Sequence, residues 1–84
     1  MVLKIYAIRD LRTCFMTPTV DLNDSSAMRN FEAACRRSDS LMYSHSEDYS
    51  LFAVGYYDQD TGKIEPVFPP ELVIDGKSIV AEKE

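Results

Sequence analysis

The stretch from Ser50 to Ile64 constrains the fold most, because it has the pattern of two strands joined by a polar turn. Residues 51–57 are mostly apolar, aromatic or β-branched, whereas residues 58–62 carry the Asp, Thr and Gly that favour turns. Gly62 suits the left-handed position that closes a longer hairpin loop, because a residue without Cβ adopts positive φ at little cost. The centre of the chain is therefore predicted to be an antiparallel β-hairpin.

Residues 2–9 are predicted to form the first strand, in which alternate residues point to opposite faces. One face carries Leu3, Ile5 and Ala7, and the other carries Lys4 and Tyr6. A turn at residues 10–13 is expected to lead into a short returning strand at residues 14–17. Pro18 should end that strand, since proline has no amide hydrogen for the ladder.

A helix is predicted from Ser25 to about Arg37, with Asn23 or Asp24 as its N-cap. Its apolar residues recur at spacings of three and four and form one stripe: Ala27, Met28, Phe31, Ala34 and Cys35. On the opposite face, Arg29 and Glu32 are expected to form an ion pair. The pattern is typical of a helix that packs one side against a sheet.

After the hairpin, three prolines are predicted to end regular pairing and to favour an extended path: Pro66, Pro69 and Pro70. Residues 72–74 are expected to form a last short strand, with a turn at 75–76 and a return at 79–80. Within the polar segment 38–49, residues 41–43 are a candidate satellite anchor. Residues 1–80 are thus predicted to be a single α+β domain in β-β-α-β-β order, a small antiparallel sheet of about four strands with one helix packed on it, and residues 81–84 a frayed tail.

The net charge of −5 is unevenly distributed along the 84 residues. Residues 1–37 hold six basic and four acidic residues, whereas residues 38–84 hold three basic and ten acidic ones. Such a chain is repelled by phosphate at long range, so any nucleic-acid contact is expected to use a local patch from the first half. No apolar run reaches the ~20 residues that span a bilayer, and no signal sequence is recognised, so a cytosolic location without membrane contact is expected.

Motifs for catalysis, metals and cofactors are incomplete. Gly76-Lys77-Ser78 resembles the end of a phosphate-binding loop, but the required earlier glycine is Glu71 here. Asp58, Asp60 and Thr61 are too few for a calcium loop, and Asp58 and Thr61 are expected to bond turn amides instead. His45 lacks a placed nucleophile, and Cys14 and Cys35 are interpreted as small, partly buried side chains. We therefore expect no enzymatic activity, no metal and no cofactor.

The remaining candidate site is a nucleic-acid patch of cations and aromatic rings, because cations neutralise phosphate and exposed rings stack on single-stranded bases. Its predicted members are Lys4, Arg9, Arg12, Arg36, Arg37, Tyr6 and Phe15. Two alternatives remain open. Arg36 and Arg37 also suit the negative pole of the helix, and Tyr6 and Phe15 also suit a core.

Short motifs along most of the chain carry a family resemblance. They are Lys4-Ile5-Tyr6-Ala7-Ile8-Arg9-Asp10, Thr17-Pro18, Asn23-Asp24, Arg29-Asn30-Phe31, Ser46-Glu47-Asp48-Tyr49-Ser50-Leu51, Gly55-Tyr56-Tyr57-Asp58 and Thr61-Gly62-Lys63-Ile64-Glu65-Pro66. In this order and spacing the chain resembles the small nonstructural protein of gokushovirus-type microviruses, which are bacteriophages with single-stranded DNA. The resemblance implies a role in single-stranded viral DNA synthesis and genome packaging, in the cytoplasm of a bacterial host.

Two hypotheses follow for the mode of action. In the first, the protein contacts single-stranded DNA weakly through the basic patch of the N-terminal half. In the second, it is an adaptor that recruits the replication initiator, a host replication protein or the procapsid without binding DNA, since an acidic surface can steer basic partners. Both are compatible with a homodimer, because a small sheet with one helix leaves an open face or edge.

Overall fold

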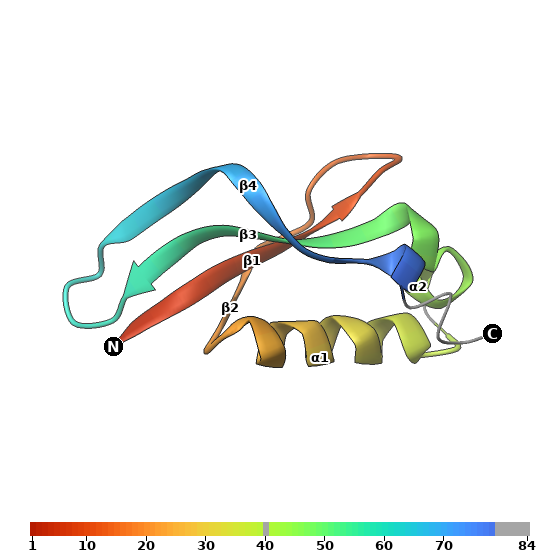
Figure 1. Ribbon diagram of the computed structural model, residues 1–84, viewed down its shortest axis with the longest axis horizontal. Helices are drawn as coiled ribbons and strands as arrows, with labels where there is room; N and C mark the ends of the chain where they lie inside the picture. The colour runs from red at the N-terminus through yellow and green to blue at the C-terminus, as the bar shows by residue number, and fades with distance from the viewer. Residues whose placement is uncertain (40, 79–84) are drawn as a thin grey trace.

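The computed structural model describes residues 1–39 and 41–78 of the protein, and it shows a four-stranded antiparallel sheet with one main helix. The elements are β1 (Val2–Asp10), β2 (Thr19–Asp21), α1 (Asp24–Arg36), α2 (Leu41–Ser44), a 3-10 turn (Ser46–Asp48), β3 (Tyr49–Asp58) and β4 (Ile64–Asp75). The strands lie in the order β2-β1-β3-β4, and α1 runs along one side of the sheet (Figure 1). The predicted α+β class and β-β-α-β-β order are confirmed.

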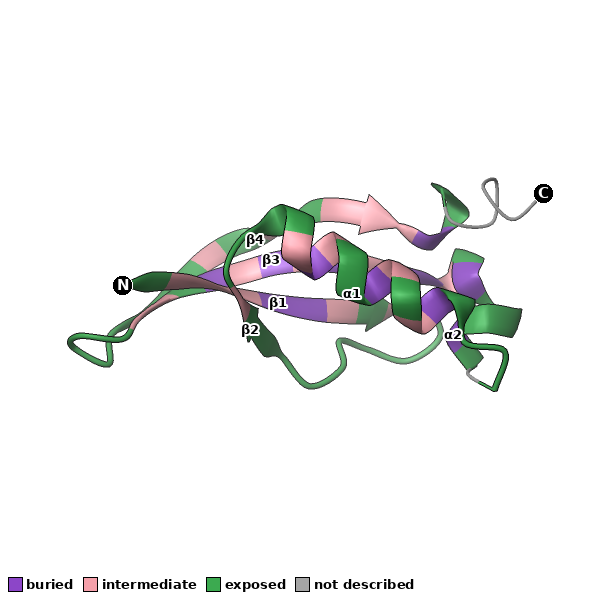
Figure 2. Cartoon of the chain, turned by 90° about the horizontal axis from the view of Figure 1, so that it is seen from below, coloured by how far each residue is buried: buried purple, intermediate pink, exposed green. Residues whose placement is uncertain are grey.

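The core lies between α1 and the face of the sheet that carries Tyr6. Tyr6 pairs with Ala53 and Ile8 pairs with Leu51, so these side chains of β1 and β3 point toward α1. The buried cluster consists of Tyr6, Ala27, Phe31, Cys35, Met42, Tyr49, Leu51 and Ala53. Viewed from the helix side, the buried residues form a stripe along α1 and along the strands behind it (Figure 2). The Leu3-Ile5-Ala7 side of β1 therefore faces away from the helix.

Helix α1 agrees closely with its prediction. The side chain of Asn23 accepts a hydrogen bond from the Ser26 amide at 2.9 Å, so Asn23 is the N-cap. Ala27, Phe31 and Cys35 are its buried residues. The expected ion pair between Arg29 and Glu32 is not formed, because Glu32 pairs with Arg36 one turn further on.

The β3–β4 hairpin turns as predicted. Gly62 has φ of 77°, the left-handed conformation, and its amide donates to the Asp58 carbonyl at 2.7 Å. The Asp58 carboxylate accepts the Asp60 amide and the Thr61 hydroxyl accepts the Lys63 amide, so both side chains hold the turn as expected.

The path after the hairpin corrects the prediction that prolines end the pairing. β4 is one strand of 12 residues that contains all three prolines and the segment 72–74. Its pairing with β3 shifts register near Val54, and there residues 67–70, with a cis Phe68–Pro69 bond, pass a single residue of β3. The prolines are tolerated because β4 is an edge strand and the extra residues lie at the register shift.

The second strand also lies elsewhere than expected. Residues 14–17 contribute only one bridge, between Phe15 and Arg9, after the predicted turn at residues 10–13. The strand proper, β2, follows Pro18 and pairs with residues 4–6 of β1. Pro18 therefore divides the returning segment into a short bridge and a separate strand.

The end of the molecule near α2 is closed by tight packing. Of the predicted satellite anchor at residues 41–43, only Met42 is buried, and it belongs to the main core cluster, whereas Leu41 and Tyr43 are exposed. Residues 76–78 form a helical turn in place of the expected reversal, and the predicted return at 79–80 and the tail at 81–84 lie outside the described residues. Cys35 is fully buried but Cys14 is exposed, which corrects its expected partial burial. Within residues 1–39 and 41–78, the helices are too short or too polar to cross a membrane.

Candidate nucleic-acid interface

Lys4 and Tyr6 meet at the N-terminal end of α1, where both bond the same carboxylate. The Tyr6 hydroxyl donates to Asp24 Oδ1 at 2.6 Å, and Lys4 Nζ lies 2.9 Å from the same oxygen. The Tyr6 ring is 1% exposed and belongs to the core. Tyr6 is therefore unavailable for base stacking, because its ring is covered by α1, and the prediction that it stacks on DNA is wrong.

The contacts within this cluster shift the pKa values of all three of its groups. The hydrogen bonds from Tyr6 and then Lys4 hold the pKa of the Asp24 carboxyl below its ordinary value. The hydrogen bond to Asp24 raises the pKa of Lys4, so its charge is retained. Burial, and then the bond to Asp24, raises the pKa of the Tyr6 hydroxyl. Lys4 thus has its charge compensated within the fold.

Arg12, Arg36 and Arg37 are exposed, and each lies beside a carboxylate. Arg12 Nε is 3.2 Å from Asp48, and it extends from the loop after β1. At the end of α1, Arg36 is 3.6 Å from Glu32 and Arg37 is 3.6 Å from Asp39. Such exposed pairs are weak, so these guanidinium groups can exchange partners, but they present little net positive charge.

Arg9 and Phe15 form the remaining contact of the predicted set. Arg9 lies near the end of β1, and its guanidinium carbon is 5.7 Å from the centre of the Phe15 ring. Phe15 in turn packs edge to face on Phe52 of β3, with ring centres 5.6 Å apart. Among the described residues, no carboxylate lies within ion-pairing distance of Arg9. We call Arg9, Phe15 and Phe52 the Arg9 corner.

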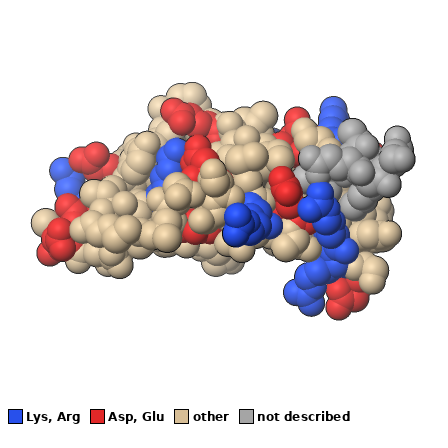
Figure 3. Space-filling view, turned by 60° about the horizontal axis from the view of Figure 1, so that its bottom comes forward, with Lys and Arg blue, Asp and Glu red and all other residues tan. Residues whose placement is uncertain are grey.

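The structure therefore divides the seven predicted residues among separate places. Lys4 and Tyr6 of β1 contact the start of α1, Arg36 and Arg37 lie at its end, Arg12 lies in the loop after β1, and Arg9 and Phe15 lie on the far side of the sheet. On the helix side, Lys and Arg atoms lie at several separate places, each with Asp or Glu atoms nearby, and the longest run of them is at the right-hand end of the view (Figure 3). Within the described chain, two predicted cations lie over an exposed aromatic ring, Arg9 over Phe15 and Lys4 over Tyr56 at 5.9 Å, and of the two only Lys4 has an ion pair, with Asp24.

Strand register explains why few carboxylates lie on the same face of the sheet as the Arg9 corner. Paired strand residues share a face, and five carboxylates lie on the helix side: Asp10, Asp21, Asp58, Glu65 and Glu71. The opposite face bears Leu3, Ile5, Ala7, Arg9, Val20, Phe52, Tyr57, Ile64, Pro66 and Leu72. We call it the open face, because no described helix covers it (Figure 1). Asp75, at its end, is the one strand carboxylate there, and it accepts a hydrogen bond from the Ser78 amide.

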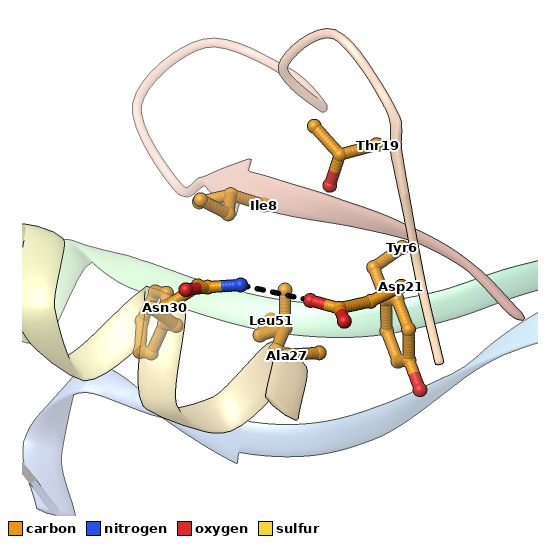
Figure 4. A pocket seen from close by; sticks show the side chains of 8 residues that line it. Tyr6, Ile8, Thr19, Asp21, Ala27, Asn30 and Leu51 are labelled. Carbon is orange, nitrogen blue, oxygen red and sulfur yellow. Dashed lines mark hydrogen bonds between the residues drawn. The ribbon is translucent and has the colours of Figure 1, made fainter. Parts of the chain in front are cut away.

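A partly open hollow of about 180 Å³ lies between α1 and strands β1 and β2 (Figure 4). Its walls include Tyr6, Ile8, Ala27 and Leu51, and Asn30 donates to Asp21 at 2.8 Å across it. Asn30 and Asp21 are thus engaged with each other, the Tyr6 hydroxyl is engaged with Asp24, and the lining places no nucleophile beside a base. Within the described residues no group of three His, Cys, Asp or Glu side chains is placed to hold a metal.

Two groups with the properties of site residues were missed by sequence reasoning. Phe52 was assigned only to a strand, because alternation gives its face but not its exposure. Arg29 is exposed on α1 and forms no ion pair with a described residue. Its spacing to Glu32 concealed this, since i,i+3 and i,i+4 partners compete for one carboxylate.

Fold and surface together define a small α+β protein with an acidic helix side and an apolar open face bordered by one uncompensated arginine. The family model for the Phage ORF5 protein matches residues 3–79. The chain therefore belongs to the Phage ORF5 protein family and is a bacteriophage protein. No curated protein and no solved structure matches it.

Proposed function

We propose that the chain is a non-enzymatic, nonstructural accessory protein of a gokushovirus-type microvirus, acting in single-stranded viral DNA synthesis and genome packaging in the host cytoplasm. Its contact with single-stranded DNA is weak and uses the Arg9 corner. Membership of the Phage ORF5 protein family and the motifs that resemble the gokushovirus protein support this assignment.

The observation that carries the DNA contact is the stack of Arg9 on Phe15 beside Phe52. Single-stranded nucleic acid is bound where a cation meets a phosphate next to rings on which bases stack. Phe15 is 40% exposed, so part of its ring is accessible to a base. Arg9 can give its charge to a phosphate without first breaking an ion pair to a described residue.

The neighbourhood of the corner suits a weak contact. Arg12 belongs to the loop that joins β1 to Phe15, and it is 78% exposed in its pair with Asp48. A phosphate can compete for this guanidinium, because exposed ion pairs contribute less than about 1 kcal/mol. The net charge of −5 opposes longer contacts, so the site should hold a few nucleotides.

Fluorescence anisotropy with a labelled oligonucleotide tests the proposal. Wild-type protein should bind single strands at micromolar concentration in ~50 mM salt, and affinity should fall as salt rises, because phosphate contacts release counterions. Arg9→Ala should weaken binding severalfold and reduce the slope of log K against log salt by about 0.7, the share of one phosphate on a single strand. Phe15→Leu should cost about 1–3 kcal/mol if a base stacks on the ring.

Arg29→Ala is the matched control, because Arg29 is an exposed arginine on α1, on the side of the sheet opposite the corner. It removes the same charge and should leave affinity nearly unchanged. The proposal fails if wild-type protein does not bind, if binding is indifferent to salt, or if Arg9→Ala and Arg29→Ala have equal effects.

The adaptor function is the second candidate, and exposed apolar side chains on β4 favour it. Ile64, Phe68 and Leu72 are 63%, 88% and 56% exposed, which is typical of surfaces that meet another protein. A pull-down with purified replication initiator and capsid proteins, before and after nuclease treatment, separates the two functions. Capture that survives nuclease supports the adaptor, and capture that is lost with the nucleic acid supports the DNA contact.

A further inference from the structure

The open face presents a continuous apolar surface across all four strands. Register places Val20 beside Ile5, Leu3 beside Tyr57, and Tyr57 beside Ile64, so each pair of side chains stands side by side on neighbouring strands. Val20, Ile64 and Leu72 are 47%, 63% and 56% exposed. On the opposite side the same strands are covered by α1, whereas the open face has no described helix over it and is covered in part at one end, where Phe15 packs on Phe52 and Ala7 is buried.

Charge decides which kind of partner this face fits. Its centre bears no carboxylate and no cation, because the strand carboxylates lie on the helix side and Arg9 and Asp75 lie at one end. A strand of DNA would find no phosphate partner at this centre, and Tyr57 is the one ring among its aliphatic side chains. A second copy of this chain carries the same −5 charge and can approach without facing carboxylates only through such a surface.

The two edges of the sheet are poorly suited to self-association. β2 has three residues, which is too short to template a further strand. The free edge of β4 contains Pro66, Pro69 and Pro70, and each lacks the amide hydrogen that strand addition requires. Pairing through an edge is therefore disfavoured at both sides of the sheet, and the face remains.

The size of the face matches a modest dimer interface. β1, β3 and β4, about 4.8 Å apart over about seven residues at 3.3 Å each, project roughly 14 by 23 Å, and the three residues of β2 add roughly 5 by 10 Å, about 380 Å² in all. Side chains that rise from the sheet expose more area than this projection. The projected area is roughly half of the ~800 Å² per partner that a standard interface buries, which is the size of a weak dimer interface. Sheets pack face to face in this way about 10 Å apart.

We infer that the centre of the open face, formed by Leu3, Ile5, Val20, Tyr57, Ile64 and Leu72, binds a second copy of the chain and forms a twofold dimer. The interface is isologous, since each copy presents the same patch. The dimer leaves the helix side of each copy outward. Its formation is independent of the Arg9 corner, because the corner borders the patch and contributes no residue to it.

Sedimentation equilibrium of the full chain, with light scattering after size exclusion, tests the inference. Wild-type protein should be substantially dimeric at about 100 µM, as an interface near the lower size limit allows. Ile64→Glu and Leu72→Glu each place two like charges in an apolar interface and should raise the dissociation constant about tenfold or more. Added salt should strengthen the dimer by screening the net charge, whereas it weakens DNA binding.

Leu41→Glu is the matched control, because Leu41 is 70% exposed on α2, away from the sheet face. It should leave the dissociation constant unchanged, and the melting temperatures of all three variants show that the fold is retained. A mass of 9.6 kDa at about 1 mM overturns the inference, as does a dimer that Leu41→Glu weakens as much as Ile64→Glu.

Discussion

Replacing Tyr6 with phenylalanine should destabilise the protein although the ring stays in the core. The variant removes only the hydroxyl that donates to Asp24 at 2.6 Å. A hydrogen bond to a charged group contributes about 1.5–3 kcal/mol. The lower value applies because Asp24 is 49% exposed and water can replace the lost donor. A loss of about 1.5 kcal/mol corresponds to a fall in Tm of roughly 6–12 °C for a domain of this size.

The pH dependence of the stability difference between wild type and Tyr6→Phe tests this prediction a second, independent way. Because the Tyr6 and Lys4 bonds lower the pKa of Asp24 in the folded state, its stabilisation is present above the ordinary carboxyl pKa. It is lost as pH falls through the lowered folded pKa. The difference between wild type and Tyr6→Phe should therefore be full at about pH 7 and smaller at about pH 3. Other carboxylates titrate in both proteins and cancel from the difference.

Urea denaturation followed by circular dichroism measures both quantities. Tyr57→Phe is the control, because Tyr57 lies on the open face, where its hydroxyl makes no hydrogen bond to a described residue. It should change the free energy of unfolding by less than about 0.5 kcal/mol, as surface substitutions do. Equal stability of Tyr6→Phe and wild type at neutral pH, or a difference that stays constant down to pH 3, refutes the assigned role of the hydroxyl.

Three further predictions concern the turns and the helix cap. Gly76→Ala should lower the free energy of unfolding by at least about 3 kcal/mol, because a Cβ there would lie 1.6 Å from the Ser46 carbonyl oxygen. At Gly62 an added Cβ meets no atom, so Gly62→Ala should cost only the ~1–2 kcal/mol of a left-handed residue. Equal urea midpoints for the two variants would contradict this. Asn23→Ala should lower the free energy of unfolding by about 1 kcal/mol and Asn23→Ser should restore it, whereas a silent Asn23→Ala would show that the cap is dispensable. Millimolar calcium should leave Tm unchanged, since Asp58 and Thr61 already accept turn amides, and a rise of several degrees in a thermal melt would overturn that expectation.

The parts of the fold that sequence predicted are those fixed by neighbours in the chain. The hairpin follows from Gly62 and the turn side chains, and α1 follows from the spacing of Ala27, Phe31 and Cys35 after the Asn23 cap. In each case the deciding contact spans a few residues, so a local pattern contains it.

The features that could not be predicted from the sequence depend on contacts between residues far apart in the chain. Alternation in β1 divides Lys4 and Tyr6 from Leu3 and Ile5, but it does not say which side α1 covers. The pair of Arg12 with Asp48 joins residues 36 apart, and the bond of Tyr6 to Asp24 joins residues 18 apart. Counting the basic residues of the first half therefore overstated the positive charge that is available to bind phosphate. The prediction that the prolines of β4 end its pairing was wrong for a related reason. Proline is tolerated in an edge strand, and which strand lies at the edge is known only once the sheet is assembled.

The unequal burial of the two thiols allows one cysteine of this small protein to be labelled selectively. Cys35 is inaccessible to a maleimide in the native state, whereas Cys14 stands in the exposed loop directly before Phe15. A single fluorophore can therefore be coupled to the wild-type chain without engineering, at a place whose surroundings change when the neighbouring aromatic ring is occupied. The same reporter, placed on two populations with donor and acceptor dyes, would follow association of copies by energy transfer.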